Sequence, residues 1–286
     1  MSRQLLAIDA GNSRLKFGLF APSQSSFFRR LGANVSKIVD VPGVWPACRR
    51  FLAIPAGDPV PWQTLQSWKP EGTVIAGSNP GAVERVLHEW PQSGLPQPLI
   101  VRQRESIAVT LDVDFPEKVG LDRLLSAVAA NALRPESRPA IVVDSGTATT
   151  VNLISASGVF CGGAILPGLE MSAKALNHYT AVLPLLPVQD LGGDLPLAPG
   201  RNTREAIRNG LFWGQVGAVR ELINQICRNR GLPGVDLLHD QGTSAAPWLI
   251  LTGGGGPVLS SQFPGVLLVP SLGMYGLVLT AWQKDA

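Results

Sequence analysis

The sequence predicts an α/β protein made of two similar domains. Apolar strand-like runs alternate with helix-like segments in the first half, which is typical of sheets layered with helices. One strand–turn–strand pattern occurs twice, at residues 6–20 and 141–155. The chain has 286 residues, 45% of them hydrophobic, which is enough for two apolar cores. We expect domains at 1–135 and 136–286, with the final helix allowed to pack back on the first.

The repeated pattern places an acid and a glycine where an apolar strand turns. Residues 6–20 read LAIDAGNSRLKFGLF and residues 141–155 read IVVDSGTATTVNLIS, so that Asp9 aligns with Asp144 and Gly11 with Gly146. Turn N–H groups, hydroxyls and a carboxylate suit a phosphate and its metal ion. The pattern therefore indicates a nucleotide held between two domains. Two ordinary hairpins with polar turns are the alternative interpretation.

Composition excludes several classes of protein. The net charge is only +3 and Lys and Arg form no block, so nucleic-acid binding is not expected. Cys48, Cys161 and Cys227 are scattered without a CxxC, which argues against a disulfide framework or a zinc site and for a reducing cytoplasm. We find no signal peptide and no apolar run of the ~18 residues that a membrane span requires.

The first hairpin is predicted at residues 5–20, because apolar strands flank its polar turn. A third strand is predicted at residues 25–31. Residues 40–70 contain six prolines and are predicted to be irregular, with short helices near 45–52 and 62–68.

Further elements are predicted up to residue 113. Residues 73–77 are predicted as a buried strand, and Asn79 followed by a proline starts a helix that runs to residue 90. Apolar residues predict further strands at 99–102 and 107–113.

Residues 119–133 have a broad apolar face at helical spacing, which predicts a helix. Asp122 and Arg123 then lie in its first turn. The helix dipole favours an ionised acid there, so simple stabilisation of the helix start is the alternative to a chemical role.

The second hairpin is followed by a strand at 158–167 that Gly162 and Gly163 interrupt, which indicates a bulge or a close backbone approach. A helix is expected at 168–179, and the Pro- and Gly-rich residues 182–200 are expected to form a loop.

A long helix is predicted to follow Asn202 as its N-cap and to reach about residue 228. Gly210, Gly214 and Gly217 form one stripe on it, which in an interior would let another backbone approach closely. Thr203 is either a ligand contact or a plain part of the helix start.

The last elements are two strands and a helix. Residues 248–251 are apolar and predict a strand, and the glycines at 253–256 would let a flat ligand such as adenine lie against bare backbone. A strand at 266–269 and a closing helix at 271–283 complete the expected fold.

Six short motifs in this order resemble the type III pantothenate kinases. They are Asp9–Ser13 with Lys16, Gly120–Arg123, Asp144–Thr150, Gly162–Gly168, Asn202–Thr203 and Thr252–Gly254. The resemblance covers about 250 residues of the chain. It implies two ribonuclease-H-like domains with a nucleotide cleft between them, as in actin-like ATPases, and a homodimer. The implied reaction is phosphorylation of pantothenate by ATP, the first step of coenzyme A synthesis, in the cytoplasm.

The resemblance also implies roles for individual residues. Asp122 is the implied proton acceptor, with Mg²⁺ held through ATP phosphates near Asp9 and with K⁺ or NH₄⁺ at Asp144. The implied ATP contacts are Asp9, Ala10, Gly11, Asn12, Ser13, Arg14, Leu15, Lys16, Thr147, Gly253 and Gly254. The implied pantothenate contacts are Gly120, Leu121, Asp122, Arg123 and Thr203. Phosphoryl transfer needs mainly positioning and charge neutralisation, which these residue types supply.

The chain departs from the family pattern at three positions. Ser13 replaces a Thr and keeps the hydroxyl, Asn152 stands where Asp is common, and Val113 stands where many members have a Tyr. Two other functions remain open from the sequence. One is a catalytically impaired homologue that acts as a regulatory binding protein, and the other is a related kinase with a different acceptor.

Overall fold

Apolar strands pair into two five-stranded mixed sheets, which confirms the predicted α/β class. The computed structural model describes residues 4–23, 27–31, 35–39, 45–135, 137–234 and 246–284. The chain divides into two units, each with one of these sheets. Unit 1 contains residues 1–28, 38–133 and 271–286, and unit 2 contains residues 29–37 and 134–270.

Unit 1 carries a sheet of order β5-β2-β1-β6-β7. Its strands are β1 Leu5–Ala10, β2 Arg14–Ser23, β5 Trp45–Pro55, β6 Gly72–Ala76 and β7 Pro98–Ile100. Its α-helices are α1 Trp62–Ser67, α2 Pro80–Glu89, α3 Leu121–Leu133 and α7 Leu272–Lys284. Its 3-10 turns are η1 Trp90–Gln92, η2 Arg104–Ser106 and η3 Pro116–Lys118.

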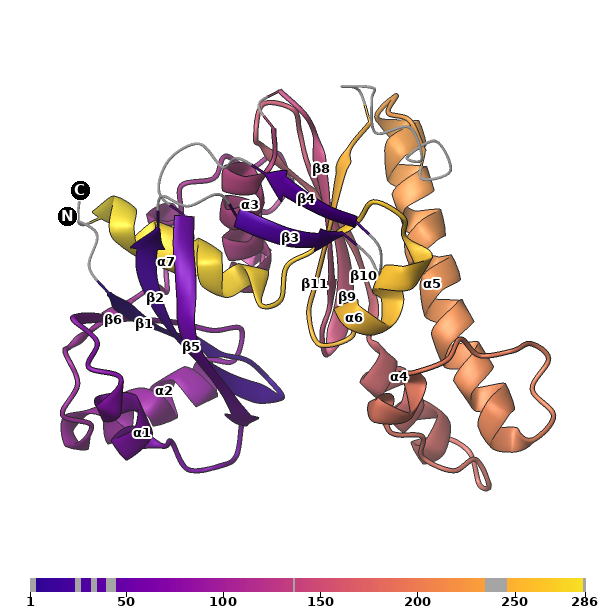
Figure 1. Ribbon diagram of the computed structural model, residues 1–286, viewed down its shortest axis with the longest axis horizontal. Helices are drawn as coiled ribbons and strands as arrows, with labels where there is room; N and C mark the ends of the chain where they lie inside the picture. The colour runs from indigo at the N-terminus through magenta and orange to yellow at the C-terminus, as the bar shows by residue number, and fades with distance from the viewer. Residues whose placement is uncertain are drawn as a thin grey trace. The chain divides into compact units, whose positions relative to one another are not determined.

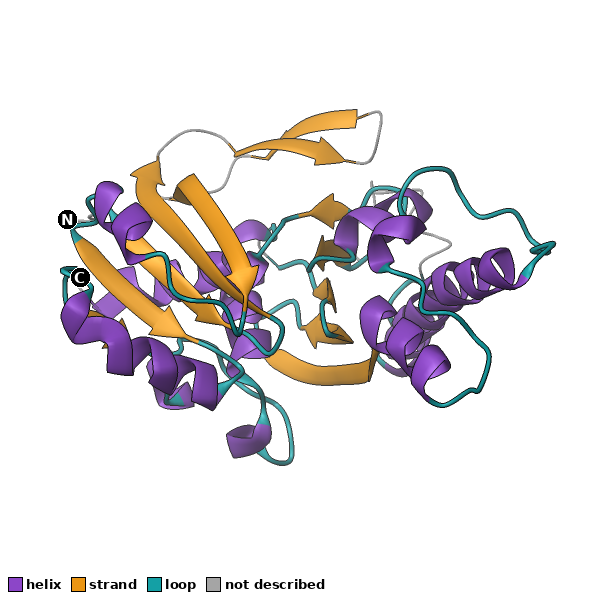
Figure 2. Cartoon of the chain, turned by 90° about the horizontal axis from the view of Figure 1, so that it is seen from below, coloured by secondary structure: helices purple, strands orange, loops and turns teal. Residues whose placement is uncertain are grey.

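Unit 2 carries a sheet of order β10-β9-β8-β11-β12. Its strands are β8 Ala140–Ser145, β9 Ala148–Ile154, β10 Phe160–Pro167, β11 Trp248–Thr252 and β12 Leu267–Leu268. Its helices are α4 Leu169–His178, α5 Thr203–Asn229 and α6 Gly256–Leu259, with 3-10 turns η4 Val188–Leu191 and η6 Ser260–Gln262. In addition, β3 Phe27–Leu31 and β4 Val35–Val39 form a separate two-stranded sheet (Figure 2).

The two sheets have the same topology. In unit 1, β1 pairs antiparallel with β2, and β2 pairs antiparallel with β5; on its other side β1 pairs with the parallel strand β6, which pairs with the parallel strand β7. In unit 2, β8, β9, β10, β11 and β12 take the places of β1, β2, β5, β6 and β7. The order is therefore third-second-first-fourth-fifth in both units. The repeat seen in the sequence is thus a repeat of a whole sheet and not only of a hairpin.

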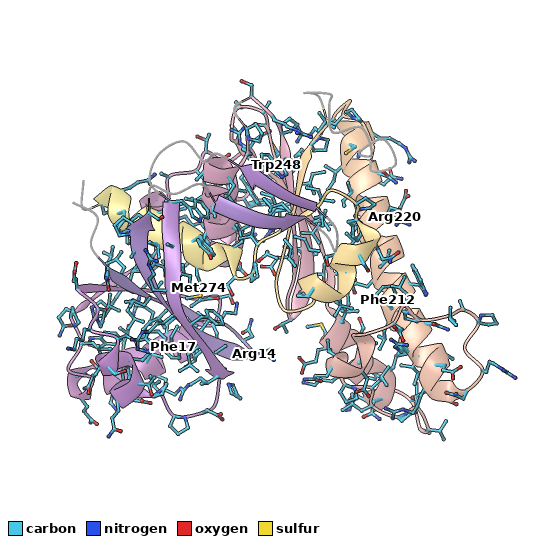
Figure 3. The ribbon with its side chains drawn as sticks, in the orientation of Figure 1. Arg14, Phe17, Phe212, Arg220, Trp248 and Met274 are labelled. Atoms are coloured by element: carbon cyan, nitrogen blue, oxygen red, sulfur yellow. The ribbon has the colours of Figure 1, made fainter. Side chains whose placement is uncertain are left out.

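Helices cover both faces of the unit 1 sheet (Figure 1), so its central strands are buried on both sides. Phe17 on β2 packs with Leu65 of α1 and Val83 of α2 in one core (Figure 3). On the opposite face, α7 lies against β1 and α3. In unit 2, Phe212 and Val216 of α5 pack on the strand residues of β8 and β9.

Two predicted elements of unit 1 are wrong. Residues 45–52 belong to strand β5 and not to a short helix, because β5 pairs with β2 along most of its length. Residues 107–113 form an irregular segment in which only Leu111 makes a bridge, so the predicted strand there is absent. Local composition cannot reveal which apolar run finds a partner strand.

The other predicted elements are observed within a few residues of their expected bounds. Asn79 and Asn202 accept backbone N–H groups at the starts of α2 and α5, as their N-cap role requires. A bulge or a close backbone approach is predicted near Gly163, and there the register of β10 shifts and a Cβ on Gly163 would overlap the Val151 carbonyl. The predicted strand at 25–31 begins at Phe27, and its first two residues lie outside the described residues. No α-helix among the described residues is both long and apolar enough to cross a membrane.

Candidate functional site

In unit 1 the predicted phosphate motif forms the turn between β1 and β2. Asp9 is the penultimate residue of β1, is half-buried, and lies opposite Lys16 of β2. The Lys16 Nζ is 3.0 Å from the Asp9 Oδ2. The Gly11 N–H donates to the Arg14 carbonyl at 3.0 Å and closes the turn. The turn therefore holds one carboxylate and one ammonium group side by side, both partly open to solvent.

The side chains of two predicted ATP contacts are part of the hydrophobic core and cannot reach a ligand. The side chains of Ala10 and Leu15 are fully buried, and Leu15 belongs to the apolar core under α1 and α2. The Ala10 carbonyl accepts the Asn79 N–H at 3.1 Å. A Cβ on Gly77 would overlap this same carbonyl, so a side chain at residue 77 is excluded. Gly77 is thus a structural requirement of this turn, and no local sequence pattern indicates it.

In unit 2 the matching turn joins β8 to β9. Asp144 is the penultimate residue of β8, as Asp9 is of β1, and is also half-buried. The Gly146 N–H donates to the Ala148 carbonyl at 3.1 Å, which leaves Thr147 exposed at the tip. Asp144 therefore lies within strand β8, one residue before its end at the turn.

The glycine run after β11 closes over this turn. Gly253 has φ +85°, a conformation that favours glycine, and a Cβ there would overlap the Asp144 Oδ1. The Gly255 N–H donates to the Ser145 carbonyl at 2.8 Å. This bond matches the one from Asn79 to Ala10, so both units fasten the end of their first strand in the same way.

The predicted substrate motif lies at the start of α3 in unit 1. Asp122 is exposed, and its Oδ1 accepts the Arg123 N–H at 2.8 Å. Gly120 leaves space for this carboxylate, because a Cβ there would come within 2.5 Å of the Asp122 Oδ1. The Arg104 Nε donates to the Val119 carbonyl at 2.8 Å and anchors the loop just before the helix. Asp122 is thus presented outward from a fixed backbone.

Arg123 is partly buried beside Asp122. Burial lowers the pKa of its guanidinium, and the charge of Asp122 opposes that effect. The group stays cationic at neutral pH, since an arginine pKa starts far above 7. A partly desolvated guanidinium is a suitable partner for a carboxylate on a ligand.

Thr203 is the first residue of α5 and is exposed. The helix start is well fastened, because the Asn202 Oδ1 accepts the Glu205 N–H at 3.0 Å and the Glu205 Oε2 accepts the Arg201 N–H at 2.7 Å. The position of Thr203 is therefore fixed by its neighbours, while its own side chain points into no described apolar core.

The structure gathers the predicted residues in two groups. Unit 1 holds the stretch from Asp9 to Lys16 and the stretch from Gly120 to Arg123, and unit 2 holds Asp144, Thr147, Thr203, Gly253 and Gly254. Within the second group, Asp144 and Gly253 are in direct proximity.

The chemistry of both turns favours hard cations. Among the described residues, no three His, Cys, Asp or Glu side chains come together as a transition-metal site would require. At Asp144 the carboxylate oxygen and the Ser145 carbonyl both border the space that a Gly253 side chain would fill. These two oxygen atoms can lie there only because residue 253 has no side chain, and oxygen ligands suit a hard cation such as Mg²⁺ or K⁺.

Two sheets of one topology, each with a carboxylate beside a glycine turn, define a two-unit α/β protein, and the type III pantothenate kinase family identified below belongs to the actin-like ATPase superfamily. The sequence profile of type III pantothenate kinases matches residues 5–225. A type III pantothenate kinase of Gluconobacter oxydans is 33% identical over 281 residues, which cover 97% of this chain and 92% of the relative. The chain therefore belongs to the type III pantothenate kinase family.

Two further comparisons agree with this result. A type III pantothenate kinase of Rhodopirellula baltica is 48% identical over 152 residues, which cover 52% of this chain and 55% of the relative. The crystal structure of a putative Baf family transcriptional activator from Campylobacter jejuni has a TM-score of 0.54 at 19% identity and covers 98% of each chain. At that identity the likeness shows a shared fold only.

Proposed function

We propose that the residues described above bind ATP, bind pantothenate, accept the hydroxyl proton and hold a monovalent cation, each in the role that its family motif implies. The chain is a type III pantothenate kinase by family, so its reaction is transfer of a phosphoryl group from ATP to pantothenate. The observation that supports this assignment is the repeated turn, which puts a carboxylate and a glycine turn at the same point of both sheets. Such groups bind phosphate oxygens and their metal ion.

In this proposal the ATP phosphates and their Mg²⁺ are bound by the turn from Asp9 to Lys16, with Thr147, Gly253 and Gly254 as further ATP contacts. The ion pair between Lys16 and Asp9 supports phosphate binding by this turn, because it places an ammonium group next to the carboxylate. Mg²⁺ bound with ATP would compete for Asp9 and leave Lys16 available to phosphate oxygens. Leu15 and Ala10 contribute through their backbone, since their side chains are buried.

Asp122 accepts the proton of the pantothenate hydroxyl in this scheme. It is an exposed carboxylate on the first turn of a helix, held by the Arg123 N–H. A strongly basic group is not required, because the hydroxyl proton can leave late in a loose transition state. Arg123 supplies a cation for the pantothenate carboxylate, and Gly120, Leu121 and Thr203 complete the substrate contacts.

Asp144 holds a monovalent cation, K⁺ or NH₄⁺, in this proposal. Support comes from the oxygen atoms of Asp144 and Ser145 beside the glycine at residue 253. The cation would neutralise charge next to the phosphates, while the protein residues supply orientation and hydrogen bonds.

We also propose a homodimer that forms through unit 2. Apolar side chains gather exposed on α4 and on the loop that follows it, including Tyr179, Val182 and Leu197, each more than 80% exposed. The glycine stripe of α5 faces open space, because a Cβ at Gly210, Gly214 or Gly217 would meet no neighbour. A second copy would cover both features and explain why α5 has no side chains along this stripe. The three cysteines are free, and we propose that the enzyme acts in the cytoplasm.

The test is ADP release from ATP and Mg²⁺, with and without pantothenate, in K⁺ and in Na⁺ buffer. We expect turnover that depends on pantothenate and on K⁺. Asp122→Asn should lower kcat by roughly 10²–10⁴-fold with little change in ATP binding, because it removes the proton acceptor. Asp114→Asn, an equally exposed acid before the same helix, is the matched control.

Two outcomes would contradict the proposal. No turnover from folded protein that binds ATP would favour the catalytically impaired, regulatory homologue. Turnover with another acceptor but not with pantothenate would favour a kinase of different substrate. Full activity of Asp122→Asn would reject only the assignment of the proton acceptor.

A further inference from the structure

Strand β9 carries a buried amide beside the proposed cation site. Asn152 is 2% exposed, and its Nδ2 donates to the Thr150 Oγ1 at 2.9 Å. Asn152 lies between Val142 of β8 and Gly163 of β10 in the sheet register. The Asn152 side chain is therefore buried in the sheet, while the hydrogen bond to the half-buried Thr150 is only partly buried.

Thr150 lies directly opposite Asp144 in the β8–β9 register. Side chains of directly opposite residues lie on the same face of a sheet, with Cβ atoms roughly 5 Å apart. Residues two apart on one strand also share a face, so Asn152, Thr150 and Asp144 form a row on one side of the unit 2 sheet. Both Thr150 and Asp144 are half-buried, so this row reaches from the sheet interior to solvent.

The direction of the hydrogen bond decides what the Thr150 hydroxyl can offer to a cation. A hydroxyl has one proton and two lone pairs. Because the Asn152 amide donates, one lone pair of the Thr150 Oγ1 is occupied, and its proton and other lone pair remain for other partners. A carboxylate at residue 152 would accept the proton instead, which would free both lone pairs and add a negative charge.

We propose that Asn152 is a positioning residue that sets the affinity of the monovalent cation site. It holds the Thr150 hydroxyl as a second oxygen ligand beside Asp144, and its neutral amide keeps the site weaker than a carboxylate would. The ligand class is a hard monovalent cation of the size of K⁺ or NH₄⁺. The inference rests on the cation role proposed for Asp144 and adds to it two residues, Thr150 and Asn152.

The test measures cation binding without turnover. The thermal unfolding midpoint of the full-length protein is followed against KCl, with choline chloride keeping the ionic strength constant. We expect Asn152→Asp to lower the half-saturating K⁺ concentration by about tenfold or more, since a unit charge acts on the cation across a few ångströms of protein. Thr150→Val should raise the half-saturating K⁺ concentration several-fold, both in the wild-type protein and in Asn152→Asp. Thr150→Ser should leave that concentration unchanged.

Two control variants distinguish the role of Asn152 from the existence of the cation site at Asp144. Asn177→Asp adds the same charge to an exposed amide elsewhere in unit 2, so it should leave the K⁺ response unchanged. Asp144→Asn should abolish the response. If Asp144→Asn abolishes it while Asn152→Asp leaves the half-saturating concentration unchanged, the role of Asn152 is wrong and the cation site stands. If Asp144→Asn has no effect, the cation site itself is wrong.

The Thr150 pair keeps the inference testable if Asn152→Asp does not fold. Equal K⁺ responses of Thr150→Val and Thr150→Ser would overturn it, because the hydroxyl would then have no part in binding. A response that survives in Thr150→Ser alone would support it.

Discussion

At residue 253 the lack of a side chain decides what surrounds Asp144. The backbone there has φ +85°, and the place of a Cβ is taken by the Asp144 Oδ1 and the Ser145 carbonyl group. A glycine is therefore required for two independent reasons, its conformation and its space. Asp122 needs a glycine for the second reason alone, at residue 120.

Gly253→Ala should lower the free energy of unfolding by about 1–3 kcal/mol, the usual cost of a strained backbone position, and should weaken the K⁺ response. Gly254→Ala is the matched control for stability, because no atom lies within 4 Å of its Cβ position. Urea unfolding of both variants is the measurement. Equal stability of the two would show that the Asp144 carboxylate moves aside at little cost.

The helices of unit 1 show how closely packed elements set the site. A Cβ on Gly276 of α7 would overlap the Leu125 carbonyl of α3, so these two helices touch backbone to backbone. The opposite face of α7 reaches β2, where Met274 is close to Gly18 (Figure 3). Helix α3, which carries the proposed proton acceptor in its first turn, is thus held by α7.

Gly276→Ala should destabilise the protein by about 1–3 kcal/mol or more through overpacking, and should impair pantothenate turnover because α3 shifts. Gly273→Ala lies on the same helix with 3.5 Å to its nearest neighbour, so we expect it to be tolerated. Thermal unfolding and KM for pantothenate are the two readouts. A neutral Gly276→Ala would mean that α3 and α7 separate easily.

The start of α5 gives a second prediction at the scale of the element. Asn202→Ala should cost about 1 kcal/mol of stability, because the Glu205 N–H loses its acceptor. Asn202→Ser should restore most of it, since serine is also a good N-cap. Both are measured by urea unfolding at pH 7. Loss in Asn202→Ser equal to that in Asn202→Ala would assign the effect to the Asn202–Glu205 side-chain contact instead.

For the whole molecule, we predict a dimer with a molar mass near twice 30.3 kDa in light scattering after gel filtration. Tyr179→Glu places a charge on the exposed apolar surface of α4 and its loop, so it should shift the protein toward the monomer. Phe51→Glu, on an exposed aromatic residue of unit 1, is the control and should leave the mass unchanged. A monomer in wild type at all concentrations would reject the dimer.

Local patterns were enough for elements whose signals lie within a few residues. The caps at Asn79 and Asn202, the bulge near Gly163 and both Asp-x-Gly turns were predicted, because each depends on one or two short-range hydrogen bonds or on backbone freedom. Strand β5 was missed because its stability comes from pairing with β2, which lies some 30 residues earlier and leaves no local mark. The glycine stripe of α5 could be found from the sequence, but only the structure shows that it lies on an exposed face of the chain.

The α/β class, the repeat with Asp9 and Asp144 at matching points, and the family could all be predicted from the amino-acid sequence alone. These depend on residue order, and order is what a sequence records. Only the tertiary structure decided that Gly77 and Gly276 are fixed by neighbouring backbones, and that Asn152, Thr150 and Asp144 share one face of a sheet. These contacts depend on strand register and on packing between segments that lie far apart in the chain. No single stretch of sequence contains both partners, so no local pattern predicts them.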